Sequence, residues 1–515
     1  MNLITIKEKT INYLKSHTVL SIILLSLLST LIAALFYSTA VSFLYPEYSS
    51  DKLGIDSYFF ILGGKEIANG VKPYSEIFDH KGLLAFLPSA LGYLIAGYYG
   101  ACTVNFIAYF IANISLMVLA NHFVKGDLTK LFFASCLCTL LWSLALGGNA
   151  NGLYVVPSIA FSYYFYLKGI EKGNNKYFLI GSLLGGLSIS IAFNIRPSDG
   201  LSIMPLYFYI LLKTFKKKTS VKDLFLNILA ALIGFLPVMI AIYSYAYSQG
   251  FLKDMILAIF TGNGNYLFTP NYFRAGWPSI LISLLFLGLS IYAYTKEKKT
   301  DAVYTNFVFI TSLINCLFNI VIARSTHYWI SYFPSILTCV MFYSSYKIEL
   351  KTKKESVSFS LTDKKVSAVL LSLELILGVS ITSFYYVAPY DFYFSNAYNK
   401  SVYKEIDENI AKKEFKNEDN VFAIETSAAV NLKYDIKNDI QFVANQVSQT
   451  EFNEDIDPTI TGYLKEKKPT YIIIDTTLIV DEKKDLEFIK YIKDNYDYMI
   501  DNYPENNIKV MQRKN

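Results

Sequence analysis

The chain has 515 residues, of which 53% are hydrophobic and 17% are charged, and its formal net charge is +5. Soluble proteins contain about 25% charged residues, so this composition argues against a soluble globular protein. The lysines gather in short clusters between apolar runs, which indicates membrane topology and argues against nucleic-acid binding.

The first apolar run, Val19–Leu44, follows the lysines at positions 7, 9 and 15. It is too long for the core of a signal peptide and no small-residue cleavage site follows it, so it predicts an uncleaved membrane span. Similar runs recur up to Tyr386, each near the roughly 20 residues that cross a bilayer as a helix. From Ala388 the chain turns rich in Lys, Asp, Glu and Asn, which predicts a membrane region over 1–387 and a separate domain over 388–515.

Basic clusters mark the cytoplasmic side of a membrane protein, and spans between two such clusters must come in pairs. The clusters lie at the N-terminus, Lys125 and Lys130, Lys168–Lys176, Lys213–Lys222, Lys296–Lys299 and Lys347–Lys365. The predicted spans are Val19–Leu44, Ala101–Ala120, Leu131–Leu146, Leu153–Leu167, Tyr177–Phe193, Leu201–Leu212, Leu224–Tyr247, Ser279–Tyr294, Ala302–Ala323, Tyr328–Tyr343 and Val366–Tyr386. This topology places the N-terminus in the cytoplasm and the C-terminal domain outside the plasma membrane.

One apolar run, Leu83–Ala96, breaks the parity of the spans. It is short and contains Pro88 and Gly92, so we expect it to dip into the outer interface while Ala101–Ala120 crosses. The expected fold class is therefore an all-α membrane bundle of about eleven helices, with a small α/β C-terminal domain. Twelve or more spans, with one lysine cluster misplaced, is the alternative.

The predicted external loops contain most of the polar residues that a lipid-facing bundle would not need. The loops are Tyr45–Lys81, Gly147–Gly152, Arg196–Gly200, Ser248–Pro278 and Arg324–His327. In the first loop, Asp56–Asn69 predicts a short helix along the membrane surface, and Asp79-His80-Lys81 follows it. A loop charge commonly just faces water, but a histidine beside a lysine places a titratable group next to a fixed cation.

Charges inside the predicted spans are scarce, and Glu374 in the last span is the main exception. An intramembrane carboxylate is a functional candidate by default, although Glu374 could equally serve helix packing. A proton-coupled transporter would need more such residues near the midplane, and broken helices in two matching halves. The sequence lacks both the additional intramembrane charges and the paired broken helices, which weakens the transporter interpretation.

The loop residues resemble a known family. The first loop, with Asp56-Ser57-Tyr58, Gly63, Gly70-Val71-Lys72-Pro73-Tyr74 and Phe78-Asp79-His80-Lys81-Gly82, is similar to that of bacterial GT-C glycosyltransferases. These are relatives of the dolichyl-phosphate-mannose–protein mannosyltransferases and the aminoarabinose–lipid A transferases. The likeness continues in Gly147-Gly148-Asn149, in Arg196-Pro197 and in Arg324-Ser325-Thr326-His327-Tyr328 before Pro334, and it covers most of residues 19–345.

The resemblance implies transfer of a sugar, with inversion, from a polyprenyl-phosphate donor to a glycan, lipid or protein acceptor of the cell envelope. It implies that Asp56 is the general base or positions the acceptor. It assigns the donor phosphate to His80 and Lys81, with Arg196 and Arg324 as further phosphate-binding residues. The remaining residues expected in the substrate pocket are Asp79, Asn149, His327 and Tyr328.

Independent chemistry agrees with these roles, because a leaving phosphate needs nearby cations and an attacking hydroxyl needs a carboxylate. The sequence indicates no definite cofactor, but some relatives bind a divalent metal. Asp56, Asp79, His80 and His327 could supply ligands for one, although their spacing is not diagnostic. One departure is that Ala150-Asn151-Gly152 stands where many relatives have an acidic residue, which puts a second carboxylate at that loop in doubt.

The C-terminal sequence predicts strands at Val421–Ile424 and Tyr471–Asp475, a helix over Lys484–Asn495 and a helical connector over Asp391–Asn417. It shows no catalytic signature, so acceptor binding, packing over the active site and a purely structural role stay open. Two other functions also stay open: a transporter or export component for lipid-linked glycans, and a polymerase or ligase that uses a diphosphate-linked donor.

Overall fold

The computed structural model describes residues 13, 16–36, 55–77, 79–144, 150–262, 284, 287, 288, 291, 302–322, 330–345, 348–351, 356–359, 406, 421–424, 428–436, 440, 455–475, 486–498 and 508–514. This part of the chain is mostly helical and contains a small sheet. It forms two compact units. Unit 1 comprises Met1–Tyr37, Phe106–Ser244 and Thr269–Val379, and unit 2 comprises Ser38–Asn105, Tyr245–Phe268 and Ser380–Asn515. Unit 2 therefore joins the first-loop region to the C-terminal part, and the boundary predicted at Ala388 stays a prediction.

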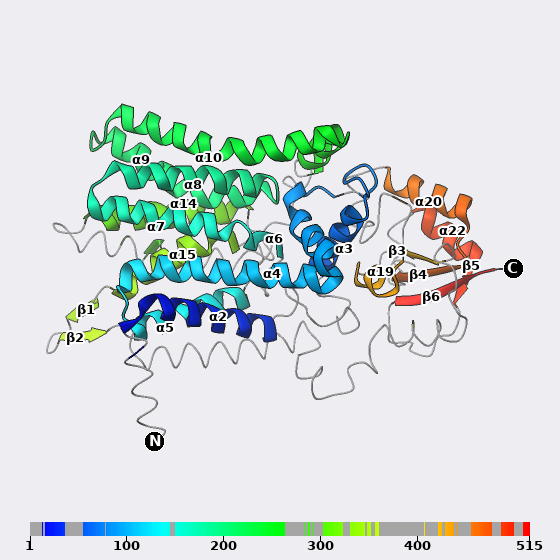
Figure 1. Cartoon of the computed structure of the whole chain (residues 1–515), viewed down its shortest axis with the longest axis horizontal. Coiled ribbons are helices and arrows are strands. Elements are labelled where there is room, and N and C mark those ends of the chain that lie inside the picture. Colours follow the sequence, from blue (N-terminus) through cyan, green and yellow to red (C-terminus); the bar gives the residue numbers. More distant parts are fainter. Residues whose placement is uncertain are drawn as a thin grey trace, which may run out of the picture. The chain divides into compact units, whose positions relative to one another are not determined.

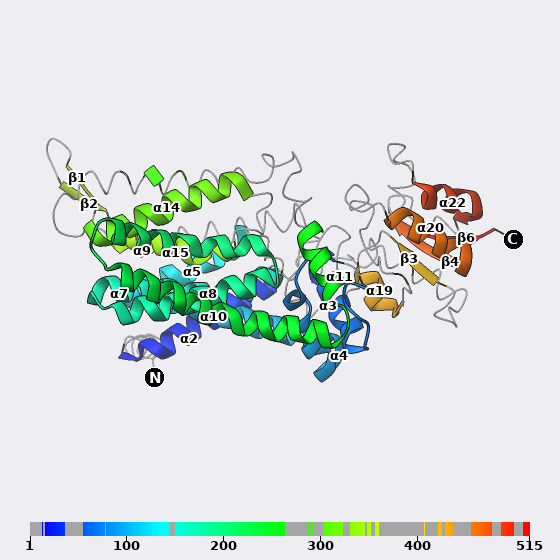
Figure 2. The same ribbon diagram turned by 90° about the horizontal axis from the view of Figure 1, so that it is seen from above.

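Helices of unit 1 run alongside one another in both views (Figures 1 and 2). They are α2 (Thr18–Phe36), the later part of α4 (Leu87–Val124), α5 (Leu128–Leu144), α7 (Val156–Lys172), α8 (Asn175–Phe193), α9 (Met204–Phe215), α10 (Val221–Ser248), α14 (Ala302–Ile322) and α15 (Phe333–Ser345), and the single turn α6 (Ala150–Leu153) precedes α7. The 3-10 segment η3 (Pro197–Ile203) joins α8 to α9, and a hairpin of β1 (Ile348–Lys351) and β2 (Ser356–Phe359) follows α15.

Three helices of the described chain are long and apolar enough to cross a membrane: residues 83–124, α8 and α10. Shorter apolar helices occur at Thr18–Ile32, Leu128–Thr139, Asn306–Leu317 and Ile330–Phe342. On α10 the exposed side chains include Phe225 and Ile240, at 64% and 61%. Such a continuous apolar face is compatible with a membrane protein. The predicted total of eleven spans is not established, since Ser279–Tyr294 is described at only four positions and Val366–Tyr386, with Glu374, lies outside the described residues.

Small and polar residues hold the helices of unit 1 together. A Cβ atom on Gly186 would lie 1.8 Å from the carbonyl oxygen of Ala231, so α8 and α10 touch through their backbones. The indole of Trp142 donates to Asn113 at 2.8 Å, and the Asn113 amide donates to Thr30 at 2.9 Å, which links α5, α4 and α2. Close glycine contacts and buried interhelical hydrogen bonds are typical of helix packing in lipid, where apolar burial gives little driving force.

The chain reverses direction within α4. Ala96 and Gly97 have non-helical backbone angles, and Gly97 has a φ of +59°. A Cβ on Gly100 would lie 2.0 Å from the Gly92 carbonyl oxygen. These glycines would stand roughly 12 Å apart on a straight helix, so the segment before the kink folds back on the one after it. Leu83–Ala96 is thus separate from Ala101–Ala120, as predicted, and its exposed side chains Leu91, Leu94 and Ile95 suit an apolar surface.

The first-loop helix α3 (Ile55–Ala68) confirms the predicted helix. Tyr58, Phe60 and Leu62 are each at most 3% exposed, and Gly63 and Gly64 lie against Phe86 and Ser89. Buried residues therefore occur on every side of α3, and a helix that is apolar all round is a buried one. Helix α3 is therefore covered by protein, and its place along the membrane surface stays a prediction.

The C-terminal part of unit 2 contains a four-stranded sheet in the order β3-β4-β6-β5, which we call the C-terminal sheet. Its strands are β3 (Val421–Ile424), β4 (Tyr471–Asp475), β5 (Tyr496–Tyr498) and β6 (Ile508–Arg513), and its helices are α19 (Ala428–Tyr434), α20 (Ile456–Lys467) and α22 (Glu487–Asn495). Strands β3 and β4 are parallel, whereas β6 is antiparallel to both β4 and β5. The two predicted strands and the predicted C-terminal helix are confirmed; the predicted connector is described only at Ile406.

Alternate residues of each strand point to opposite faces, so the C-terminal sheet has two apolar faces. One face, with Phe422, Ile472 and Met511, packs against α20 and α22. On the other face, Ala423, Ile473 and Val510 share a core with α19 and with Tyr58, Phe60 and Leu62 of α3. Two segments more than 300 residues apart in the chain therefore form one core.

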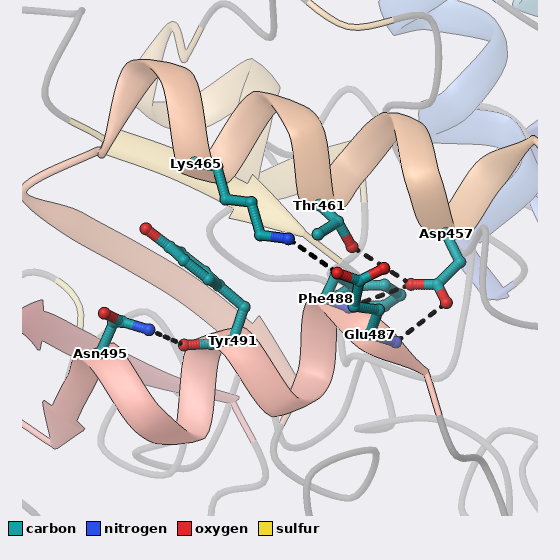
Figure 3. A network of polar contacts seen from close by, with 7 residues as sticks. All are labelled: Asp457, Thr461, Lys465, Glu487, Phe488, Tyr491 and Asn495. Carbon is teal, nitrogen blue, oxygen red and sulfur yellow. Dashed lines mark hydrogen bonds and ion pairs between the residues drawn. The ribbon is translucent and has the colours of Figure 1, made fainter.

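Helix α22 begins at a carboxylate supplied by α20 (Figure 3). Asp457 accepts hydrogen bonds from the backbone N–H groups of Glu487 at 2.9 Å and Phe488 at 3.0 Å. These N–H groups have no partner inside the helix, and the negative charge also suits the positive end of the helix dipole. Nearby, Lys465 pairs with Glu487 at 2.7 Å, with both side chains more than half exposed.

We expect Asp457→Ala to lower the local stability of α22 by about 1–2 kcal/mol, the usual cost of losing a helix cap. Hydrogen–deuterium exchange should show roughly 5- to 30-fold faster exchange of the α22 amides, which corresponds to that loss. Lys465→Ala is the matched control, because an exposed ion pair contributes only about 0–1 kcal/mol. Equal exchange in both variants would contradict the capping role.

Candidate functional site

The motif Asp79-His80-Lys81 forms the first candidate group, in unit 2. Asp79 is 4% exposed, and its Oδ1 accepts a hydrogen bond from the backbone N–H of Lys81 at 3.0 Å. The same oxygen lies 3.2 Å from His80 Nδ1, and Oδ2 lies 3.5 Å from Lys81 Nζ. A buried carboxylate thus orients an imidazole and an ammonium that are both partly exposed.

Tyr74 fixes the backbone that presents this motif. Its backbone has a φ of +67°, its N–H donates to the carbonyl of Ile77 at 2.8 Å, and its hydroxyl donates to the carbonyl of Lys81 at 2.8 Å. The ring is 2% exposed and packs against Phe251 at a centroid distance of 6.1 Å. The segment at residues 70–74 therefore ends in an anchored tyrosine whose hydroxyl holds the backbone at Lys81.

Lys81 also contacts α3. Its Nζ lies 5.2 Å from the centroid of the Phe60 ring, within the range of a cation–π interaction. Positions 56 and 60 are four residues apart on α3 and so share one face of the helix. Asp56 is the second residue of α3, and its side chain lies outside the described part of the structure. Position 56 therefore lies on the face of α3 that Lys81 contacts at Phe60.

Arg196 forms the second candidate group, in unit 1. Its side chain is 9% exposed and donates from both Nε, at 3.0 Å, and Nη2, at 2.7 Å, to Oδ1 of Asp199. Asp199 is 1% exposed. Burial raises the pKa of its carboxyl above the ordinary value, although the Arg196 guanidinium and the Ser331 hydroxyl act in the opposite direction. A buried guanidinium held by a carboxylate three residues away is a rigid donor, not a loop cation that just faces water.

Ends of three predicted loops meet around Arg196. A Cβ on Gly152 would lie 3.5 Å from Arg196 Nη2 and 3.2 Å from the Ile330 side chain. Gly152 ends the second external loop, and Ile330 follows the last one. The structure thus brings Gly152, Arg196 and Ile330 together. Asn149, Arg324, His327 and Tyr328 lie outside the described residues, so their roles stay predictions.

Sequence reasoning missed Asp199 and the buried role of Asp79. The available signal for Asp199 was the spacing Arg196-Pro197-Ser198-Asp199, which returns a carboxylate to the arginine when the segment forms a 3-10 turn. Asp79 was expected in the substrate pocket, and the structure instead shows a buried carboxylate that contacts His80 and Lys81. In the part of the chain that the structure describes, no group of three or more His, Cys, Asp or Glu residues could hold a metal ion. Since Asp56 and His327 lie outside that part, the metal alternative stays untested.

No protein-family model matches the chain, and no curated protein matches its sequence. The resemblance to GT-C glycosyltransferases therefore rests on the loop residues alone.

We expect Asp199→Ala to destabilise unit 1 by about 3 kcal/mol or more, because it leaves the buried Arg196 charge without its partner. Asp199→Asn, which keeps an oxygen acceptor, should cost less. The thermal unfolding midpoint in detergent measures both effects. Glu171→Gln, at an exposed carboxylate of the same unit, is the control and should leave the midpoint unchanged. A midpoint for Asp199→Ala equal to that of the control would contradict a stabilising ion pair.

Proposed function

We propose that the protein is a membrane glycosyltransferase that moves a sugar from a polyprenyl-phosphate donor to a cell-envelope acceptor on the outer face of the plasma membrane. The observation that supports it best is the Asp79-His80-Lys81 group, whose two cationic or titratable side chains are held beside α3. A phosphate requires such preorganised donors. Asp56 lies in the first turn of the same helix, before its apolar residues, and supplies the carboxylate.

The proposed topology has about eleven spans, a cytoplasmic N-terminus and an external C-terminal α/β domain. Its support is the lysine distribution together with the three long apolar helices and the reversal at Gly97. In this topology the first loop, the Arg196 turn and the segment before α15 all lie outside. A donor lipid that has already reached the outer leaflet would meet them there, without any nucleotide sugar.

In the proposed reaction the acceptor hydroxyl oxygen attacks the anomeric carbon while the bond from that carbon to the phosphate oxygen breaks. The Asp56 carboxylate takes the hydroxyl proton, and the polyprenyl phosphate leaves with the bonding electron pair. Single displacement inverts the anomeric configuration. Lys81 and His80 stabilise the negative charge that develops on the phosphate, and Arg196 and Arg324 are proposed to add to this field.

Asp79 has a defined part in this proposal. It orients His80 and Lys81 before the donor arrives, so little reorganisation is needed when the phosphate charge grows. Its contact with Lys81 Nζ, at 3.5 Å, is long for a charge-assisted hydrogen bond. The ammonium can therefore turn toward a phosphate at small cost while the backbone N–H of Lys81 keeps its bond to Asp79.

The first test is Asp56→Asn, assayed with the lipid-linked sugar that copurifies with the protein and is identified by mass spectrometry. Loss of the general base should lower kcat by about 100-fold or more while the protein still folds. Glu76→Gln, an exposed carboxylate in the same predicted loop, is the control and should keep full activity.

Full transfer by Asp56→Asn would overturn the mechanism. Transfer from diphosphate-linked donors alone would indicate a polymerase or ligase, and transport without transfer an export component.

The second test concerns the phosphate. Lys81→Gln and His80→Gln should each raise the KM for the lipid-phosphate donor by about tenfold or more, the usual value of a hydrogen bond to a charged group. Initial rates over a range of donor concentrations separate KM from kcat. Lys72→Gln, an exposed lysine of the same loop, should leave the donor KM unchanged. Unaltered KM values in both site variants would show that His80 and Lys81 do not bind the donor phosphate.

A further inference from the structure

We propose that the C-terminal part of the chain holds helix α3 in its working position, and that Lys65 and Asp435 are positioning residues for Asp56. The part of this inference that concerns Asp56 rests on the proposed function. The packing of α3 does not, because it follows from contacts within unit 2.

The first argument concerns the second face of the C-terminal sheet, to which α19 alone contributes among the helices that the structure describes in the C-terminal part. Helices α20 and α22 cover the face with Phe422, Ile472 and Met511. The opposite face shares a core with α19 and with α3, whose Tyr58 and Leu62 lie one turn apart on one side of the helix while Phe60 packs against Phe86 on the other. Burial of these apolar side chains in one core stabilises the position of α3.

The second argument is an ion pair at the other end of α3. Lys65 is 5% exposed, and its ammonium contacts Asp435, the residue that follows α19. Asp435 has a φ of +52°, the left-handed conformation that commonly ends a helix, and its side chain is 62% exposed. A lysine that is almost fully buried needs such a partner, and this one comes from the C-terminal part of the chain.

The third argument is that α3 cannot adjust toward α4 if its outer contacts are lost. A Cβ on Gly64 would lie 2.6 Å from Ser89 and 2.7 Å from the backbone nitrogen of Ala90, and one on Gly63 would lie 2.5 Å from the Phe86 ring. Helix α3 therefore packs between the start of α4 and the C-terminal sheet. The contacts of Phe60 with Phe86 and with Lys81 couple this position to the Asp79-His80-Lys81 group.

The inference explains why a part with no catalytic signature follows the membrane region. Position 56 lies in the first turn of α3, and Lys65 lies in its last turn, about 13 Å further along the axis. A tilt of the helix at the Lys65 end would move position 56 relative to Lys81. The C-terminal part thus acts on the reaction through α3, without contacting the reacting atoms.

The test uses the full-length protein with Lys65→Met, Asp435→Asn, Lys65→Glu and the exchanged pair Lys65→Glu with Asp435→Lys. Methionine keeps the length and packing of Lys65, and Asp435 is exposed, so Lys65→Met and Asp435→Asn should fold normally.

Hydrogen–deuterium exchange of the α3 amides should rise about tenfold in the single variants and return toward wild type in the exchanged pair. In transfer assays kcat should fall about tenfold in the single variants, with the donor KM unchanged, and recover in the exchanged pair. Lys465→Ala, at an exposed ion pair distant from α3 in sequence, is the control for both readouts.

Unchanged α3 exchange in the single variants, or no recovery in the exchanged pair, would overturn the holding role. Faster α3 exchange with unaltered kcat would overturn the positioning of Asp56. The two proposals fail separately: if the wild type shows no transfer from lipid-phosphate sugars, the proposed function fails, while the exchange data still decide whether Asp435 holds α3.

Discussion

The second face of the C-terminal sheet is the constraint on which the organisation of unit 2 depends. A sheet with alternating apolar residues has two faces to bury: α20 and α22 cover one of them, and among the described helices of the C-terminal part only the short α19 contributes to the other. Tyr58 and Leu62 of α3, one turn apart on the same side of the helix, belong to the core on that second face. The first loop and the end of the chain consequently fold as one core. The ion pair between Lys65 and Asp435 joins the same two parts of the chain.

Buried carboxylates organise both candidate groups, although in different ways. Asp79 faces two partly exposed donors, one of them at a long 3.5 Å, so those donors can serve a ligand as well as the protein. Asp199 is paired with a guanidinium that is itself almost buried, and breaking such a pair is costly. In the proposed glycosyltransferase, His80 and Lys81 are therefore the groups best suited to bind the donor phosphate. Arg196 is better suited to contribute a fixed field.

Unit 1 is stabilised by contacts typical of helices in lipid. Backbone contact at Gly186 brings α8 against α10, and the chain Trp142–Asn113–Thr30 links three helices through buried hydrogen bonds. The exposed apolar side chains of α10 and the reversal at Gly97 are compatible with the membrane topology that we propose from the lysine clusters. The same rigid packing fixes η3, and with it the Arg196–Asp199 pair, since Tyr163 of α7 donates to the carbonyl of Ser202 at 3.1 Å.

The sequence by itself determined the local elements. Length and hydropathy predicted the helices of unit 1, Pro88 and Gly92 predicted that Leu83–Ala96 is separate from the following span, and β-branched runs predicted β3 and β4. These features depend on neighbouring residues, so a pattern is enough to find them. Only the tertiary structure decided that α3 is covered by protein, that Asp79 is a buried counterion, and that Asp199 holds Arg196. Each depends on what packs against the residue from elsewhere in the chain: periodicity shows that α3 has apolar faces, but not that a sheet from the other end of the protein covers one of them.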